Sequence, residues 1–258
     1  MRHHAPVVRS SGRPQRAARG SPWLAAPQVT FRTVRDRQMS GGRNATSLKL
    51  YGVPQSPFVR KVRIALEEKG LPYEMEAPVP GQHPTGKMPV LRDGAVGVPD
   101  SSVICAYLEK TRPSPPFYPD DTGDYARALF LEEYADTAMT EGMGPIVFER
   151  TVKPRLLGQP TDTQELEELL AAASERWFGK PTTVTGQPIP AVLDWVESQL
   201  PADRDSVLAR FSIADVAIGA HLGWLGLAGF EIDEARWPRA ARYRRALEAR
   251  PSFEATAG

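Results

Sequence analysis

The spacing of hydrophobic residues divides residues 48–70 into a strand, a loop and a helix. Residues 48–51 alternate between leucine and a more polar side chain, which is the two-residue period of a strand with one buried face. Apolar residues then return at helical spacing, at Val59, Val62 and Leu66, and Gly70 fits the left-handed position just past a helix end. The pattern predicts a strand over 48–51 and a helix over 57–69.

The segment that follows predicts a sheet. Residues 72–76 are typical of a strand, whereas residues 78–86 contain too many prolines and glycines for a helix of any length. Residues 87–91 resemble a strand apart from their central proline, and residues 92–94 predict a hairpin turn into a short strand over 95–98. This order of elements predicts a mixed sheet with helices packed on it.

A second helix is expected to begin around Ser101 and to end at Lys110. Its apolar residues Val103, Ala106 and Tyr107 are expected on one face of the helix, and Ile104 and Leu108 beside that face. Cys105 lies within the apolar part of this helix, so we expect an inert, packed thiol. Residues 111–124, with four prolines, predict a linker between two domains.

The rest of the chain has helical spacing throughout. One apolar stripe contains Phe130, Tyr134 and Ala138, and its neighbour contains Leu131, Ala135 and Met139. Further helices are expected over 165–177, 189–200 and 236–250. In the last of these, Arg239, Arg242 and Arg245 are expected on a solvated face.

A further helix start is marked by two independent signals. Ser212 and Asp215 have the spacing of a capping box, and Phe211 and Val216 occupy the two positions of a hydrophobic staple. The helix that follows is apolar nearly all round, so we expect it at the centre of a second core.

Composition narrows the class of protein. A chain of 258 residues with 41% hydrophobic and 24% charged residues suggests about two globular domains, and no apolar run approaches the length of a membrane span. The single cysteine cannot form an internal disulfide, which is compatible with a reducing compartment. No group of cysteines and histidines has metal-ligand spacing, so no metal is expected.

Charge is distributed unevenly along the chain. Residues 1–46 contain nine arginines, no lysine and one acid, so they carry +8 and the remainder −7. We expect them to be a disordered basic extension. An organelle transit peptide, a nucleic-acid arm and an upstream in-frame extension are the open explanations. We favour the third, because Met39 lies shortly before the first strand. No apolar signal core is present, and we expect a cytoplasmic protein without membrane or nucleic-acid partners.

The loop before the first helix ends in Ser56 and Pro57. Serine at the N-cap and proline at the first helical position are a strong helix-start signal. This places a hydroxyl beside the unpaired N–H groups and the positive end of a helix, where an anion is favoured. Taken alone, Ser56 is better explained as a helix cap than as a binding group.

Two further segments offer groups suited to a small acidic peptide. Pro89 cannot donate to a sheet ladder, and a cis bond at the start of a strand would leave the backbone of Met88 free to pair with an extended peptide. Asp100 and Ser101 offer a carboxylate and a hydroxyl at another helix start. Each segment also has a structural explanation. Pro89 can serve folding alone, and Asp100 and Ser101 can serve only to cap the helix.

These segments resemble the motifs of a known family. Residues 56–63, 86–91 and 100–104 look like the three motifs of the thioredoxin-like domain of cytosolic glutathione transferases, and residues 211–215 are similar to the capping motif of their helical domain. The resemblance covers residues 47–254. It implies an α/β thioredoxin-like N-terminal domain over 47–111, a linker over 112–124 and an all-α helical bundle over 125–258.

The resemblance also implies a glutathione site. Ser56 would hydrogen-bond the glutathione sulfur, and Met88, before cis-Pro89, would pair its backbone with the cysteinyl unit. Asp100 and Ser101 would bind the γ-glutamyl end. Lys87 would approach the glycyl carboxylate, unless it is merely a solvated charge.

The implied activity is the addition of a glutathione thiolate to an electrophilic small molecule in detoxification, by a homodimeric enzyme. Serine replaces the cysteine of glutaredoxins at position 56, which disfavours thiol–disulfide exchange. Two departures favour an alternative, a non-catalytic binding module: Asp100 stands where the family more often has glutamate, and residues 78–86 are too short for the usual helix. A glutathione-dependent isomerase or dehalogenase is the third possibility. Tyr134 and Trp224 are candidates for the electrophile pocket or for core packing.

Overall fold

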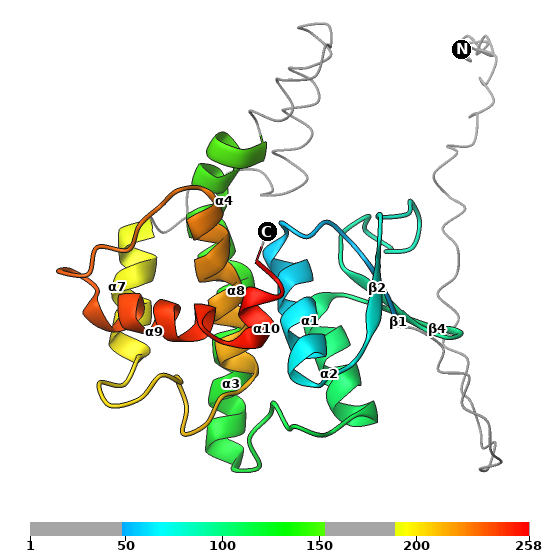
Figure 1. Cartoon of the computed structure of the whole chain (residues 1–258), viewed down its shortest axis with the longest axis horizontal. Helices are drawn as coiled ribbons and strands as arrows, with labels where there is room; N and C mark the ends of the chain where they lie inside the picture. The colour runs from blue at the N-terminus through cyan, green and yellow to red at the C-terminus, as the bar shows by residue number, and fades with distance from the viewer. Residues whose placement is uncertain (1–47, 153–188, 258) are drawn as a thin grey trace, which may run out of the picture.

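The computed structural model describes residues 48–152 and 189–257 (Figure 1). The first half contains β1 (Leu48–Tyr51), α1 (Pro57–Glu68), β2 (Tyr73–Glu76), β3 (Val90–Asp93), β4 (Val96–Pro99) and α2 (Ser101–Thr111). The second half is helical, with α3 (Thr122–Tyr134), η1 (Ala135–Met139), α4 (Thr140–Val147), η2 (Phe148–Val152), α7 (Ile189–Gln199), α8 (Ile213–Leu227), α9 (Pro238–Glu248) and α10 (Pro251–Glu254). The expected basic extension over 1–46 and the expected helix over 165–177 lie outside the described residues.

The four strands form the predicted mixed sheet, in the order β2-β1-β3-β4. β1 pairs in parallel with β2 and antiparallel with β3, which pairs antiparallel with β4. Leu48 and Leu50 are buried as their alternation predicts, and α1 and α2 lie between the sheet and the helical half (Figure 1). An α/β domain is thus followed by a helical one. Residues 112–121 between them contain no helix or strand.

Two details of this half differ from the expectation. The hairpin turn lies at Gly94 and Ala95, two residues that connect the paired β3 and β4, and not at 92–94. In α2 the buried stripe contains Ile104, Cys105 and Leu108, whereas Val103 is 53% exposed. The helix packs against β3, β4 and α1 through that narrower stripe, so one edge of its apolar surface is left exposed to solvent.

The long helical segment from α3 to η2 is interrupted by π-helix. Leu131, Ala135, Met139 and Met143 are all fully buried, although a strict four-residue spacing drifts around an α-helix. The wider turn of η1 keeps this series on one face. The neighbouring predicted stripe lies at the edge of the core: Phe130 is 57% exposed, whereas Tyr134 is partly buried and packs against the core.

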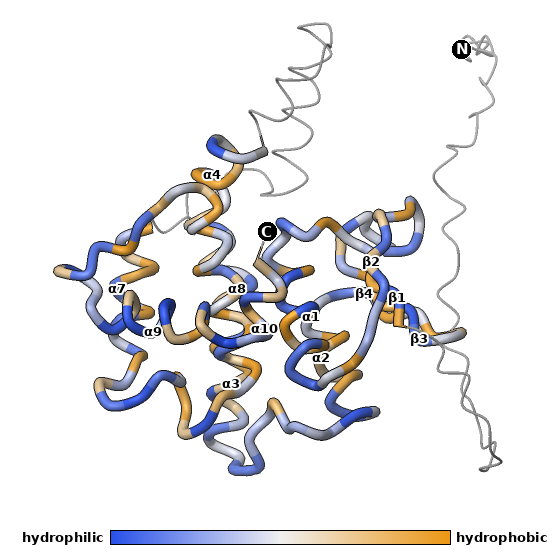
Figure 2. Tube along the Cα trace, viewed as in Figure 1, coloured by the Kyte–Doolittle hydropathy of each residue, from blue (hydrophilic) through white to orange (hydrophobic). Residues whose placement is uncertain are grey.

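α8 lies at the centre of the helical half, as predicted, and every residue from Ile213 to Leu225 is buried. Its start is fixed by Asp215, whose carboxylate accepts from the backbone N–H of Ser212 at 2.8 Å. The other carboxylate oxygen accepts from the Val207 backbone and from the Tyr243 hydroxyl, each at 2.8 Å. Hydrophilic residues predominate in the loops at the periphery of the molecule (Figure 2). No helix among the described residues has the length and apolar character needed to cross a membrane.

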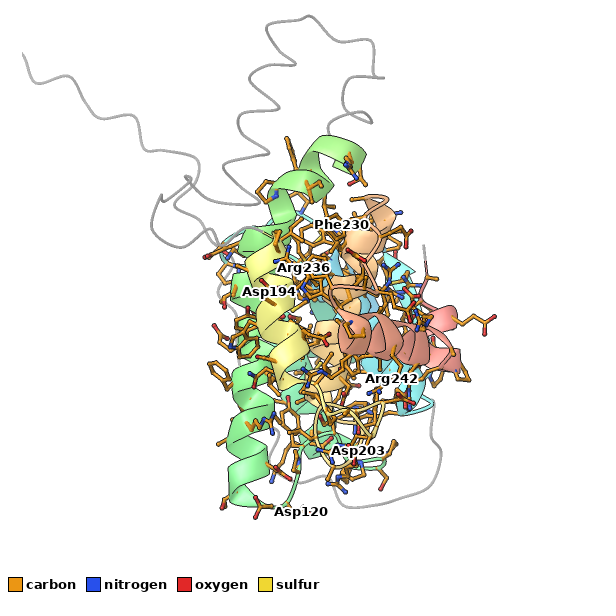
Figure 3. All side chains as sticks on the ribbon, turned by 90° about the vertical axis from the view of Figure 1, so that its left-hand side faces the viewer. Asp120, Asp194, Asp203, Phe230, Arg236 and Arg242 are labelled. Carbon is orange, nitrogen blue, oxygen red and sulfur yellow. The ribbon has the colours of Figure 1, made fainter. Side chains whose placement is uncertain are left out.

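The arginines of α9 are bound to neighbouring elements and do not form a merely solvated face. Arg239 pairs with Glu197 of α7 at 3.0 Å, and Arg245 pairs with Glu234 at 2.9 Å. Arg242 donates to the carbonyls of Pro201, Ala202 and Arg204. Figure 3 shows Arg242 above the loop that contains Asp203. These glutamates and loop carbonyls lie on other segments of the chain, so helical spacing cannot reveal them as partners.

Candidate active site

A cavity of about 720 Å³ lies where the two halves of the chain meet. One side is formed by the N-terminal ends of α1 and α2 and by the segment from His83 to Met88. The other side is formed by α3, η1 and α4, together with Trp224 of α8. Five of the six predicted site residues line it: Ser56, Lys87, Met88, Asp100 and Ser101. The sixth, Pro89, follows Met88 in the chain and is buried.

Ser56 is the N-cap of α1, as its place before Pro57 predicts. Its backbone is extended, with φ −71° and ψ 129°, and its hydroxyl accepts from the backbone N–H of Val59 at 3.5 Å. This distance is at the limit of a hydrogen bond, and the contact leaves the hydroxyl proton unused. Ser56 therefore presents a hydrogen-bond donor to the cavity beside the positive end of a helix.

The segment before β3 presents an unpaired stretch of backbone. The Met88–Pro89 peptide bond is cis, as predicted. Among the described residues, no protein group hydrogen-bonds the backbone N–H or C=O of Met88. Residues 77–89 contain no helix, so the exposed Lys87 lies on a loop at the edge of the cavity.

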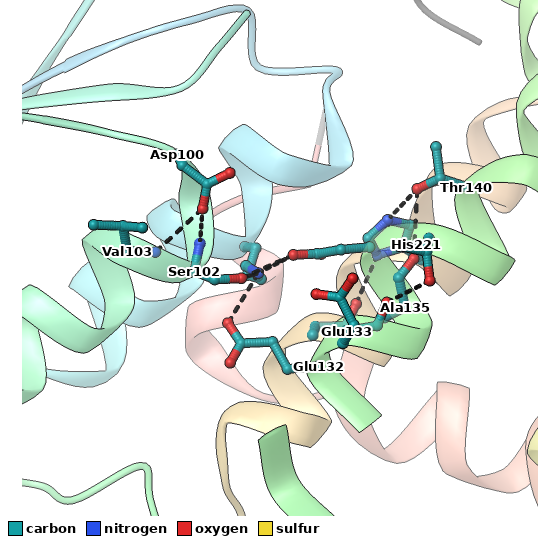
Figure 4. Close-up of polar contacts among 12 residues, drawn as sticks. Asp100, Ser102, Val103, Glu132, Glu133, Ala135, Thr140 and His221 are labelled. Atoms are coloured by element: carbon teal, nitrogen blue, oxygen red, sulfur yellow. Dashed lines mark hydrogen bonds and ion pairs between the residues drawn. The ribbon is translucent and has the colours of Figure 1, made fainter. Parts of the chain in front are cut away.

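Asp100 caps α2 from a left-handed backbone conformation, with φ 76°. One carboxylate oxygen, Oδ1, accepts from the N–H groups of Ser102 at 3.0 Å and Val103 at 3.2 Å (Figure 4). The other oxygen accepts nothing from the described residues, and Ser101 beside it is 2% exposed. The cap explanation and a binding role are thus compatible, because each uses a different oxygen.

A buried lysine connects the two sides of the cavity. The Lys61 ammonium donates to Ser102 Oγ at 2.8 Å, Glu132 Oε1 at 3.0 Å and Asp136 Oδ2 at 2.6 Å. Burial lowers the Lys61 pKa, but the two carboxylates more than offset this and hold its pKa above the ordinary value. Lys61 therefore remains a cation, and it joins α1 and α2 to η1.

The wall from α3 to α4 was not predicted from the sequence. Its lining residues are Glu133, Asp136, Thr137, Thr140 and Glu141. They lie about one helical turn apart, so a polar stripe was readable, but polar stripes on helices are ordinarily solvated. This stripe differs from an ordinary solvated stripe only because α1 and α2 lie across the cavity from it, which the sequence does not show.

Of the two aromatic candidates for the pocket, one lines the cavity. Trp224 does so although it is 4% exposed. Tyr134 instead stacks on Trp195, with ring centroids 3.8 Å apart. The Cys105 thiol is fully buried, and burial raises its pKa, which agrees with inert packing. The described residues contain no group of side chains that would hold a metal ion.

Comparisons with known proteins agree with this arrangement. Residues 50–116 match the model of the glutathione S-transferase N-terminal domain, and residues 164–246 match that of the C-terminal domain. A glutathione S-transferase from Methylobacterium radiotolerans, solved in complex with glutathione sulfonate, is 31% identical, with a TM-score of 0.59 over 82% of this chain and 95% of that one. The chain belongs to the cytosolic glutathione S-transferase family. The predicted fold class is therefore confirmed.

Curated relatives of this glutathione S-transferase family member match over part of their length. The GST-like protein YibF of Escherichia coli is 35% identical over 48% of this chain and 61% of its own length. Glutathione S-transferase U4 of Arabidopsis thaliana is 30% identical over 52% of this chain and 61% of its own length. The chain thus spans about three fifths of the length of these relatives. The β-etherase LigF of Sphingobium, at 22% identity and a TM-score of 0.66, shows the shared fold alone.

Proposed function

We propose that the protein is a serine-type glutathione transferase, in which Ser56 stabilises the glutathione thiolate for attack on an electrophilic carbon. The observation that carries this proposal is the position of Ser56 at the start of α1, in one cavity with Met88, Asp100 and Ser101. A hydroxyl that donates to sulfur and the positive end of a helix both favour the charged form of a thiol.

The residues around the cavity fit the rest of the tripeptide. The free backbone of Met88 is suited to pair with the cysteinyl unit, and the unused oxygen of Asp100 is suited to the γ-glutamyl ammonium. Ser101 would bind the carboxylate at the same end, and Lys87 the glycyl carboxylate. The carbon–sulfur bond would form as the electrophile's leaving group departs or its double bond takes up a proton.

The energies are sufficient without a general base. Lowering a thiol pKa from about 8.5 by roughly two units needs about 2.7 kcal/mol. A hydrogen bond from a hydroxyl to a charged group contributes about 1.5–3 kcal/mol, and a helix end up to about 2 kcal/mol. The two together reach the required value.

Titration of bound glutathione by thiolate absorbance tests this proposal. In the native protein we expect a thiol pKa of about 6.5, and in Ser56→Ala a value at least about one unit higher. Because the variant then holds less thiolate, its kcat/KM should fall most below neutral pH and recover as pH rises through the new pKa. Ser198→Ala removes an exposed hydroxyl from α7 and is the matched control.

Two results would contradict the proposal. If glutathione does not bind, or binds with an unshifted pKa, the non-catalytic binding module remains. If a thiolate forms but adds to no electrophile, a glutathione-dependent isomerase or dehalogenase remains, and a substrate screen separates the two.

We also propose that the protein is a cytoplasmic homodimer that acts in detoxification. The dimer is supported by large apolar side chains left exposed on one helix of each half, Val103 on α2 and Tyr125, Leu129 and Phe130 on α3. Light scattering of the purified chain tests the dimer.

A further inference from the structure

The side of the cavity opposite Ser56 has an unusual hydrogen-bonding character. We use the term acceptor wall for the lining residues contributed by α3, η1 and α4, which are Glu133, Asp136, Thr137, Thr140 and Glu141. All five have polar side chains, and three are carboxylates. An ionised carboxylate only accepts hydrogen bonds, so the two threonines decide whether the wall offers any donor.

The Thr137 hydroxyl offers none, because its proton is used within the helix. Thr137 Oγ1 donates to the backbone carbonyl of Glu133 at 2.7 Å. A threonine hydroxyl carries one proton, so only its lone pairs remain for a ligand.

The proton of the Thr140 hydroxyl is also used within the protein, in a hydrogen bond to a buried histidine. His221 is fully buried between Thr140 and its own helix, and burial lowers its pKa, so the ring is neutral. Nδ1 donates to the carbonyl of Ala217 at 2.9 Å, because a carbonyl only accepts. Nε2 is then an acceptor, and Thr140 Oγ1 contacts it at 3.0 Å (Figure 4). The other partner of this hydroxyl, the Ala135 carbonyl at 3.4 Å, is an acceptor too.

Asp136 adds an acceptor that the protein leaves unsatisfied. Its Oδ2 accepts from Lys61 and from Ser102. Its Oδ1 is buried and has no hydrogen-bond partner among the described residues. Buried polar atoms are normally paired, so this part of the wall has one acceptor more than the protein's donors satisfy.

The wall also carries net negative charge. Lys61 is shared by Glu132 and Asp136, so it does not neutralise the carboxylates of Glu133 and Glu141. Within the part of the chain that the structure describes, neither of these two forms an ion pair, and both are exposed. Phe58 and Trp224 contribute aromatic rings to the same cavity.

We infer that the electrophile accepted by this transferase is a cation with N–H donors, such as an ammonium, amidinium or guanidinium group on a flat unsaturated or aromatic frame. A surface with acceptors only and a net negative charge is complementary to such a group, and aromatic rings favour it further. A neutral apolar electrophile would leave these polar groups without partners. The inference rests on the proposed function and specifies its second substrate.

Calorimetric titration with benzamidine, benzamide and benzoate tests the inference without any catalysis. At low ionic strength, we expect benzamidine to bind about tenfold or more tightly than benzamide, and benzoate more weakly than both. The double variant Glu133→Gln/Glu141→Gln should lose most of the benzamidine preference. Glu231→Gln removes one charge from a loop outside the cavity and should retain it.

Equal binding of benzamidine and benzamide, a preference for benzoate, or a preference that survives the double variant would overturn the inference. Circular dichroism of each variant verifies that it folds. Because the substitutions replace exposed carboxylates by isosteric amides, we expect native spectra.

Turnover separates this inference from the proposed function. Two acrylamides with the same reactive double bond, N-(2-aminoethyl)acrylamide and N-propylacrylamide, are compared after subtraction of the uncatalysed rate. We expect a kcat/KM ratio of about tenfold in favour of the ammonium compound. Efficient turnover of both without that preference overturns the inference alone. Absence of a bound thiolate overturns the proposed function, while the benzamidine comparison still tests whether the acceptor wall prefers a cation.

Discussion

At the residue scale, some of the buried polar side chains are held by several partners each. The buried Lys69 ammonium donates to the Glu109 carboxylate and to the backbone carbonyls of Arg112 and Pro115. It also lies 4.4 Å from the ring centroid of Phe117. The Asp215 carboxylate is 0% exposed and accepts four hydrogen bonds, which oppose the rise in its pKa that burial causes. Such groups are costly to bury and more costly to leave half-paired.

Asp215→Ala should therefore be strongly destabilising. It leaves buried donors of Val207, Ser212 and Tyr243 without an acceptor, at about 1–3 kcal/mol each, and removes the cap of α8. We expect a loss of at least about 3 kcal/mol in free energy of unfolding, measured by urea denaturation. Asp215→Asn keeps an acceptor oxygen and should cost less; equal losses would contradict this account.

Residues of the site differ in how far the sequence reveals them. Ser56, Met88 and Asp100 each lie in a short motif whose geometry is local, a cap or a turn into a strand, so sequence reasoning predicts the local backbone features that the structure has there. Thr140 offers no donor to the cavity because its hydroxyl proton is used by His221, 81 residues later in the chain. No local pattern carries that information, so the sequence shows a polar stripe on these helices but not that the stripe offers acceptors only.

At the element scale, the contact between α8 and its neighbours depends on small residues. A Cβ atom on Gly219 would lie 2.5 Å from Phe253 Cε1 and 2.7 Å from Leu247 Cδ1. A Cβ on Gly223 would overlap the buried guanidinium of Arg60. The sequence predicts α8 as a buried helix, but the close approach of α1 and α10 to it follows from pairing between distant elements.

Gly219→Ala should destabilise the protein in spite of alanine's better helix propensity. The added methyl group meets packed rings and methyl groups of α9 and α10, and overpacking of this kind costs about 1–3 kcal/mol. Thermal unfolding measures the change. Gly97→Ala is the control, because a Cβ there meets nothing within 4 Å; a Gly219→Ala protein as stable as Gly97→Ala would contradict the model of tight packing.

At the scale of the whole molecule, the two halves are joined through α1. Lys61 pairs with Glu132 and Asp136 of the helical half, and Arg60 and Arg63 donate to backbone carbonyls at its C-terminal end. Glu68 binds Arg250 at 2.8 Å. The halves should therefore unfold together.

Lys61→Met tests this coupling. It leaves two carboxylates without their buried cation, which should cost about 3–5 kcal/mol. All five tryptophans lie outside residues 48–121, so tryptophan fluorescence senses the first half only where the two halves meet, at the cavity that Trp224 lines. We expect the fluorescence and far-UV transitions to shift together, whereas Lys110→Met, on the surface of α2, shifts neither. A fluorescence transition that stays in place would show that the halves unfold separately.

The bridge formed by Lys61 also limits how ligands exchange. A hinge motion that separated α2 from η1 would pull an ammonium away from Asp136 at the base of the cavity. Such an open conformer would give up these charge-assisted hydrogen bonds, so we expect it to be sparsely populated. We therefore expect substrates and products to exchange past the side chains that line the cavity, without separation of the two halves.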